Sequence, residues 1–136
     1  MLGSYILVIK LNREKNIIVG KMGEIFFDKG HYVYVGSALN GIMQRVSRHL
    51  NPQKKLHWHI DYLLEFAKIE SIYYKQSNTR QECEIASELK EKLQPVPGFG
   101  CSDCNCKSHL FYGTYDRVID SIEKLEMDRL LIEANS

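Results

Sequence analysis

The stretch GHYVYVGSALNGIMQRVSRHL, residues 30–50, contains the change of pattern that decides the fold. Its first part is rich in aromatic and β-branched residues, which favour a strand over residues 31–36. The second part has the period of a helix, predicted over residues 38–50 and ended by Asn51 and Pro52. Its apolar side chains fall on one side of a helical wheel: Leu39, Ile42, Met43, Val46 and Leu50.

Upstream of this stretch the pattern is that of short strands. Residues 4–11 are apolar and β-branched enough to form a buried strand. Glycines then separate two further short strands, predicted near residues 17–20 and 24–28. The first part of the chain therefore predicts an antiparallel sheet.

Downstream, helical and strand patterns alternate. Helices are expected over 58–67 and 80–93 and from Thr114 or Asp116 onward, strands over 69–75 and 109–113, and a loop between 94 and 108. A chain of 136 residues is long enough for one domain with its own core. We predict an α+β fold over residues 1–136, with a small central antiparallel sheet flanked by helices and a C-terminal helix.

Charge is distributed unevenly in a chain that is close to neutral overall, at +1. No Asp or Glu occurs from Lys29 to Ile60, where four of the five histidines lie. The bases of this segment are Lys29, Arg45, Arg48, Lys54 and Lys55. We expect an anion-binding surface here. No apolar run approaches the roughly 20 residues of a membrane helix, so we expect a cytoplasmic protein without a membrane partner, whose thiols stay reduced.

The predicted helix over 38–50 places Arg45 and His49 one turn apart, at the edge of its apolar stripe. Gly36, just before the helix, would let a ligand approach the backbone closely. The planar fork of an arginine suits a phosphate because it binds two oxygens at once. The alternative is an ordinary solvated basic face.

The order of several motifs resembles the GIY-YIG endonuclease superfamily. These motifs are GSY at residues 3–5, YVG at 34–36, and the R-x-x-x-H spacing of Arg45 and His49. Longer stretches are similar to its Uri-like branch: YVYVGSA, HWHIDYLL (57–64), EC (82–83) and GFGCSDCNCKSHLFY (98–112). The two motif strands are further apart in this chain than in the superfamily, so we expect an extra strand or hairpin between them.

The resemblance implies a metal-dependent endonuclease that hydrolyses DNA phosphodiester bonds, with RNA as the alternative substrate. Tyrosine would assist the attack of water and arginine would stabilise the transition state, so the implied catalytic residues are Tyr5, Tyr34, Arg45 and His49. The residues expected to contact nucleic acid are Gly36, Arg48, Lys54, Lys55, His57 and His59. A second copy or a partner protein would supply further contacts. The alternatives are an inactive nucleic-acid-binding module and a zinc-stabilised interaction domain.

The resemblance also implies that a glutamate on a later helix holds Mg²⁺ or Mn²⁺. On a helical wheel Glu82 falls inside the apolar arc, whereas Glu84 faces water. An inward carboxylate is costly unless something binds it, so we favour Glu82 as the metal ligand. The alternative is a capping box in which Glu82 returns to the backbone of Thr79.

A tyrosine with a pKa of about 10 is protonated at neutral pH and is a poor base. Arg45, a metal-bound water or a protonated His49 would have to lower the pKa of the tyrosine. Otherwise the tyrosine positions the water, or it is a packing residue of a strand.

Three cysteines are clustered as C-x-x-C-x-C and are followed by His109. Tetrahedral zinc could take Cys104 and Cys106 with Cys83 or His109 as a further ligand. Because no second well-spaced pair exists, we favour a buried thiol cluster that packs the loop over structural zinc.

Overall fold

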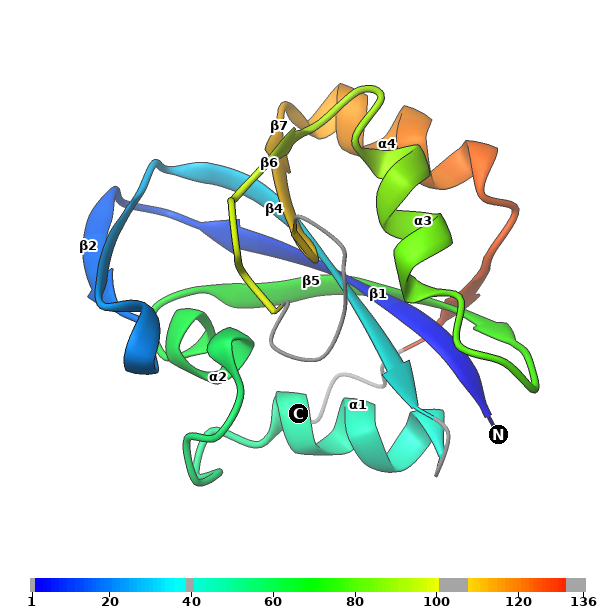
Figure 1. The fold of residues 1–136 in the computed structure, drawn as a ribbon, viewed down its shortest axis with the longest axis horizontal. Coiled ribbons are helices and arrows are strands. Elements are labelled where there is room, and N and C mark those ends of the chain that lie inside the picture. The colour runs from blue at the N-terminus through cyan, green and yellow to red at the C-terminus, as the bar shows by residue number, and fades with distance from the viewer. Residues whose placement is uncertain (1, 39–40, 101–107, 132–136) are drawn as a thin grey trace.

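Six antiparallel strands form the central sheet of the computed structural model, which describes residues 2–38, 41–100 and 108–131. Their order across the sheet is β6-β7-β4-β1-β5-β8 (Figure 1). The elements in chain order are β1 (Gly3–Leu11), β2 (Lys15–Ile18), the short 3-10 helix η1 (Gly20–Met22), β3 (Glu24–Phe27), β4 (Gly30–Ala38), α1 (Ile42–Leu50), α2 (His59–Leu64), β5 (Lys68–Gln76), α3 (Glu82–Leu89), β6 (Gln94–Pro95), β7 (Leu110–Gly113), α4 (Tyr115–Lys124) and β8 (Asp128–Leu130). The predicted α+β class is confirmed.

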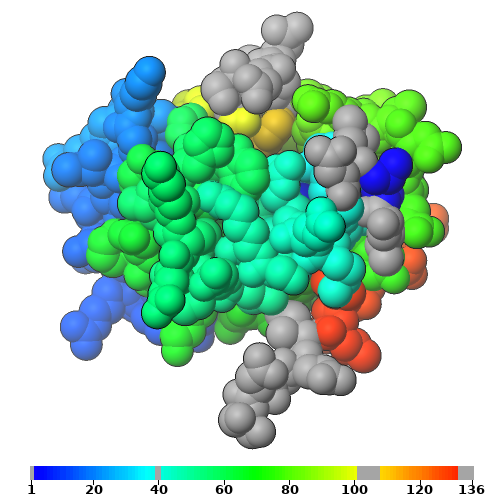
Figure 2. Space-filling view, turned by 90° about the horizontal axis from the view of Figure 1, so that it is seen from below, coloured from blue at the N-terminus to red at the C-terminus, as the bar shows by residue number. Residues whose placement is uncertain are grey.

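Helices cover both faces of the sheet because strand β1 is apolar on both sides. Tyr5, Leu7 and Ile9 point to the face covered by α1, α2 and the hairpin of β2 and β3. Ile6 and Val8 point to the other face, which α3 and α4 cover. Figure 2 views the molecule from the side of α1 and α2 and shows that these helices and the segment between them hide the sheet. Burial on both faces explains why β1 reads as a continuous apolar run.

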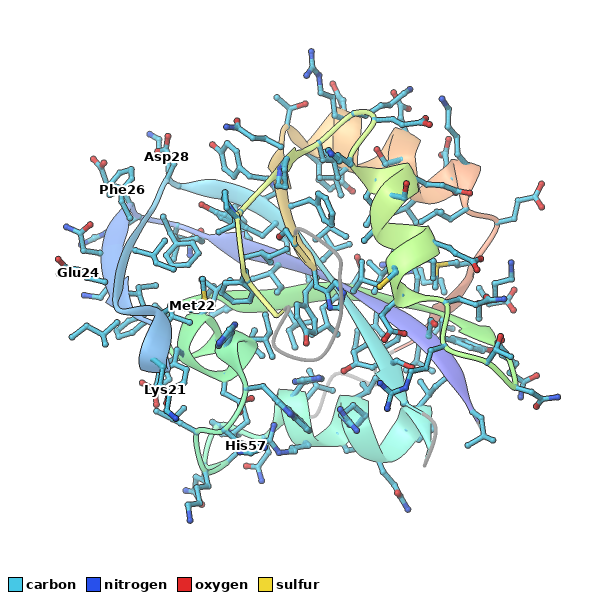
Figure 3. The ribbon with its side chains drawn as sticks, in the orientation of Figure 1. Lys21, Met22, Glu24, Phe26, Asp28 and His57 are labelled. Atoms are coloured by element: carbon cyan, nitrogen blue, oxygen red, sulfur yellow. The ribbon has the colours of Figure 1, made fainter. Side chains whose placement is uncertain are left out.

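The hairpin of β2 and β3 is a separate two-stranded sheet inserted between the neighbouring strands β1 and β4. The extra strand or hairpin expected between the two motif strands is therefore confirmed. In Figure 3, Glu24, Phe26 and Asp28 of this insertion lie at the outer edge of the molecule. The insertion leaves the pairing of β1 with β4 intact, with Tyr5 opposite Gly36.

Helix α1 differs from its prediction in its start and in its buried face. It begins at Ile42, and Leu39 lies outside the described residues. Met43 and Leu50 are 49% and 40% exposed, whereas His49 is 2% exposed. The buried face of α1 therefore includes His49, because the hydroxyl of Tyr5 in the core is a polar partner for its imidazole. The end of the helix before Asn51 is confirmed.

Helix α4 and the neighbouring short strands refine the predicted C-terminal part. Oγ1 of Thr114 accepts a hydrogen bond from the backbone N–H of Arg117, which confirms Thr114 as the cap of this helix. Strand β8 follows the helix and pairs with β5, and β6 pairs with β7; neither strand is predicted from the sequence. Within the described residues, none of the helices combines the length and apolarity that a membrane crossing requires.

Candidate functional site

A cavity of about 480 Å³ lies beside the second half of strand β4. We call it the β4 cavity. Segments that are far apart in the sequence line it: Tyr34, Val35, Gly36 and Ser37 of β4, Arg45 of α1, His57, Trp58 and His59 at the start of α2, Arg80 and Glu82 at the start of α3, and Gly100 and His109 before β7. Seven of the residues that sequence analysis singled out for catalysis, metal or nucleic acid therefore meet here: Tyr34, Gly36, Arg45, His57, His59, Glu82 and His109.

Tyr5 and His49 form a hydrogen-bonded pair behind the wall of this cavity. Oη of Tyr5 lies 2.6 Å from Nε2 of His49, and the two residues are 1% and 2% exposed. A Cβ added at Gly36 would overlap the Tyr5 ring. The missing side chain at Gly36 therefore makes room for Tyr5, in addition to placing Gly36 in the cavity lining. Neither Tyr5 nor His49 is part of that lining.

Burial controls the protonation of this pair. It raises the pKa of Tyr5 well above the ordinary value; Tyr34 adds to this rise, and the nearby Arg45 and Arg48 oppose it. Burial also lowers the pKa of His49 to about 4, although Asp61 favours the charged imidazole. At neutral pH Tyr5 is protonated and His49 is neutral. The hypothesis that a protonated His49 lowers the pKa of a tyrosine is therefore wrong at this pH.

Tyr34 is the motif tyrosine that reaches the cavity. Its ring contacts His49 at a centroid distance of 6.1 Å and Phe99 at 6.4 Å, both edge-on. It is only partly buried and lines the cavity. Tyr34, and not Tyr5, can therefore touch a water molecule or a ligand in this space.

The two arginines of α1 have different surroundings. Arg48 donates from Nη1 to Oδ1 and from Nη2 to Oδ2 of Asp61, each at 2.9 Å, and also binds the carbonyl of Lys55. Arg45 lines the cavity, and its Cζ lies 4.2 Å from the centroid of the Trp58 ring. Arg48, which was predicted to contact nucleic acid, is used within the fold, while Arg45 faces the site.

Lys54 and Lys55 lie outside the cavity lining. Nζ of Lys54 donates to the carbonyl oxygens of His49 and Asn51, so this lysine satisfies the C-terminal end of α1. Partial burial lowers the pKa of Lys54. Lys55 is exposed. Of these two predicted nucleic-acid contacts, only Lys55 leaves its side chain at the surface.

Asp61 is a key residue that the sequence analysis missed. It has no exposed surface and accepts hydrogen bonds from both Arg48 nitrogens and from the backbone N–H groups of His57 and Trp58. Burial raises the pKa of Asp61, but these hydrogen bonds, led by that from Arg48, hold it below the ordinary value. The available signal was its position: Asp61 is the first acid after the acid-free segment and lies in the first turn of α2.

Glu82 has the environment that the helical wheel predicted. It is 8% exposed and lines the cavity, whereas Glu84 is exposed. The capping-box alternative is wrong, because α3 begins at Glu82 with Gln81 as its cap, and Thr79 pairs with Ser77 instead. Oε2 of Glu82 is buried without a hydrogen-bond partner in the described structure.

A buried carboxylate oxygen without a donor is costly unless a cation binds it. Glu82 therefore fits Mg²⁺ or Mn²⁺, hard cations that take oxygen ligands. No group of three or more His, Cys, Asp or Glu side chains that could hold a metal ion occurs in the described parts of the chain. The residues present thus suit a cation bound by one carboxylate, with waters and ligand oxygens completing its coordination.

Three histidines also line the cavity: His57, His59 and His109. Nδ1 of His59 accepts a hydrogen bond of 2.8 Å from the backbone N–H of Gly100, and burial lowers the pKa of His59. His57 is exposed and lies before helix α2, as in the extended-segment interpretation of the pair His57 and His59. His59 is the first residue of α2, as in the helix-start interpretation. Burial also lowers the pKa of His109, against the field of Glu82. The sequence analysis placed His109 only in the zinc set.

Three further lining residues with polar or aromatic side chains were missed: Ser37, Trp58 and Arg80. Oγ of Ser37 is buried without a hydrogen-bond partner among the described residues. Arg80 is exposed and lies two positions before Glu82. Proximity in sequence to YVG and to Glu82 was the signal available for Ser37 and Arg80, whereas nothing in the pattern marks Trp58 beyond its two flanking histidines.

The predicted zinc set is only partly within the described structure, since Cys104 and Cys106 lie outside it. Cys83 is disulfide-bonded, which differs from the expected reduced thiol. A disulfide sulfur offers no thiolate to zinc, so zinc at Cys83 stays a prediction for the reduced protein. His109 remains a candidate ligand by chemistry, placed in the β4 cavity.

Comparison with known proteins gave one match. A family model described as "Domain of unknown function DUF123" matches residues 4–130. No curated protein and no solved structure matches the chain.

Proposed function

The chain belongs to the DUF123 family, which is described as a domain of unknown function, and we propose that it is a divalent-metal-dependent endonuclease. The basis of this proposal is the set of groups that line the β4 cavity. The enzyme hydrolyses phosphodiester bonds of DNA on a scaffold of the GIY-YIG superfamily, Uri-like branch. RNA is the alternative substrate. The proposal rests on the motifs of the sequence and on the chemistry of the cavity together.

One observation carries the proposal: Glu82 lines the same cavity as Arg45 and Tyr34, and one oxygen of its carboxylate is buried without a hydrogen-bond partner among the described residues. These residues come from three different elements: α3, α1 and β4. A carboxylate, a guanidinium and a phenol around one cavity are the groups that phosphodiester hydrolysis needs: a cation ligand, a phosphate clamp and a group that orients water.

Glu82 would hold the divalent cation, which when bound supplies positive charge next to the phosphate. Arg45 binds two non-bridging phosphate oxygens through its planar fork and stabilises the charge of the transition state. Tyr34 orients the attacking water through its hydroxyl. Tyr5 stays protonated and fixes His49, so its contribution is positional.

A second candidate function is a binding module that has lost hydrolysis. The observation that favours it is the burial of Tyr5, which is 1% exposed and has a pKa well above ordinary. If catalysis in this chain requires the tyrosine of the first motif as a base, the site binds a phosphate without cutting. A zinc-stabilised interaction domain is the third candidate, and it depends on the cysteines discussed above.

The test is nicking of supercoiled plasmid DNA with Mg²⁺, with Mn²⁺ and with EDTA. We expect nicking with either metal and none with EDTA. Glu82→Gln should abolish metal-dependent nicking, because an amide is a poor ligand for these cations. The matched control Glu84→Gln, two residues away and facing water, should nick like wild type.

Salt-dependent DNA binding without any nicking would replace the endonuclease by the binding module. If Glu84→Gln abolishes activity and Glu82→Gln does not, the metal site is assigned to the wrong carboxylate. Binding of Mn²⁺, followed by electron paramagnetic resonance, gives the same comparison without a substrate: Glu82→Gln should lose the bound signal and Glu84→Gln should keep it.

Duplex binding is expected to require more than one chain. Arg48 and Lys54 are engaged within the fold, so few of the basic side chains around α1 are left for phosphates beyond the cavity. We propose that a second copy or a partner protein contributes the remaining contacts. A chain that binds a duplex tightly as a monomer would contradict this part of the proposal.

A further inference from the structure

We propose that Trp58 is a positioning residue for Arg45, and that Asp61 holds Trp58 in place both directly and through Arg48. The inference rests on the proposed function in so far as Arg45 is the phosphate clamp. It goes further by assigning a task to two residues that carry no role in the motif-based prediction, Trp58 and Asp61, and by giving Arg48 a structural task in place of the predicted contact with nucleic acid.

The first step is the anchoring of Trp58 by one carboxylate. Asp61 accepts a hydrogen bond of 2.8 Å from the backbone N–H of Trp58, and its two oxygens bind the two terminal nitrogens of Arg48. Asp61 has no exposed surface, so its charge is not screened by water. A bidentate pair of this kind fixes the plane of the Arg48 guanidinium.

The second step is the contact of the indole ring with both arginines. The Cζ atoms of Arg48 and Arg45 each lie 4.2 Å from the centroid of the Trp58 ring. Trp58 has the most favourable ring for a cation. The anchored Arg48 therefore restrains the ring, and the ring in turn restrains Arg45, whose guanidinium lines the cavity.

The third step is what this arrangement leaves free. The ion pairs that the described residues form are His31–Glu70 and Arg48–Asp61, and Arg45 belongs to neither. A carboxylate partner would occupy the fork of Arg45 and neutralise its charge. An aromatic ring attracts the guanidinium without taking up its charge, and N–H donors remain available to a phosphate. The device orients a phosphate-binding arginine while keeping it available.

The kinetic test compares Trp58→Phe with Trp58→Leu in the plasmid-nicking assay. We expect kcat to stay within about threefold of wild type for Trp58→Phe, which keeps an aromatic face. For Trp58→Leu we expect kcat to fall about tenfold or more with little change in KM, because the transition-state contact of Arg45 is weakened. Equal activity of Trp58→Leu and wild type would overturn the proposal.

A matched control exists on another part of the surface. Nζ of Lys15 lies 4.6 Å from the centroid of the Phe66 ring, and neither residue belongs to the cavity lining. Phe66→Leu removes a cation–aromatic contact of the same kind and should leave kcat unchanged. A loss of kcat in Phe66→Leu as large as in Trp58→Leu would mean that the effect is one of stability, and would overturn the positioning role.

A spectroscopic test needs no turnover, because Trp58 is the single tryptophan of the chain. We expect inorganic phosphate to change the Trp58 fluorescence of wild type saturably, since a phosphate on Arg45 alters the charge next to the indole. Arg45→Ala should lose this response. Arg80→Ala removes another cation of the cavity that does not contact the ring, and should keep a response to phosphate.

The two sets of measurements separate the failure of this inference from that of the proposed function. If wild type never nicks DNA but phosphate changes Trp58 fluorescence through Arg45, the endonuclease fails and the positioning stands. If DNA is nicked but the fluorescence response is absent or unchanged in Arg45→Ala, the positioning fails and the endonuclease stands.

Discussion

The Tyr5 hydroxyl lies 2.6 Å from Nε2 of His49 and ties the first strand of the sheet to helix α1 inside the core. The residues are 44 positions apart in the sequence, and the contact is almost inaccessible to water. The pair lies directly behind the wall of the β4 cavity, so it links the stability of the fold to the shape of the candidate site.

Tyr5→Phe should lower the free energy of unfolding by about 1–3 kcal/mol, because it leaves a buried imidazole nitrogen without its partner. Urea denaturation followed by circular dichroism measures this. Tyr112→Phe is the control: its hydroxyl donates to the carbonyl of Lys29 in an exposed position, and its loss should cost less. Equal losses in the two variants would contradict the importance of the buried pair.

Stability should decrease as the pH falls from about 6.5 toward 4. The pKa of His49 is about 4 in the folded protein and about 6.5 when unfolded, so the unfolded chain binds more protons in this window. The stabilising contribution is fully present above pH 6.5 and is lost as the pH drops, by up to about 3 kcal/mol for His49 alone. His59 and His109, whose pKa values are also lowered, act in the same direction.

Urea denaturation at a series of pH values checks this dependence. His49→Gln removes the titrating group while keeping a polar side chain for Tyr5, so its stability should fall less steeply between pH 6.5 and 4. Parallel curves for wild type and His49→Gln would show that His49 binds protons equally in the folded and unfolded states, so that folding does not lower its pKa.

Asp61→Asn should be far more damaging than the loss of a surface carboxylate. It removes the charge that pairs with Arg48, whose side chain is 28% exposed and keeps part of its hydration, so we expect a cost of about 1.5–3 kcal/mol. Glu70→Gln changes the exposed 2.8 Å contact between Oε1 of Glu70 and Nε2 of His31, and should cost less than about 1 kcal/mol. Thermal melts of both variants decide this, and similar shifts in Tm would contradict the structural role of Asp61.

Arg45→Lys should lose most nicking activity although it keeps the positive charge. A compact ammonium group cannot form the bidentate contact to two phosphate oxygens. It also contacts the indole face less well than the planar guanidinium does. Steady-state kinetics measure this, with Arg13→Lys, the same change at an exposed arginine outside the cavity lining, as the control. An unimpaired lysine variant would remove Arg45 from its assigned role.

The predictable part of this protein is the part controlled by local pattern. The apolar run of residues 4–11 predicted the central strand, and the change of period after the YVG motif predicted strand β4 followed by α1. Thr114 was one of the two predicted caps of the last helix. The inward direction of Glu82 was also predictable, because a helix of known period fixes which side chains share a face with Ile85. In these cases each residue's environment depends on its near neighbours in sequence.

Only the tertiary structure decided which side of α1 is buried and what each charged residue contacts. Met43 and Leu50 are exposed and His49 is buried because Tyr5, from a distant strand, provides a polar partner in the core. The sequence predicted that both Arg45 and Arg48 bind an anion, but Asp61 engages Arg48, whereas Arg45 lines the cavity. Burial and long-range pairing set these outcomes, since both depend on elements that meet only after the sheet has formed.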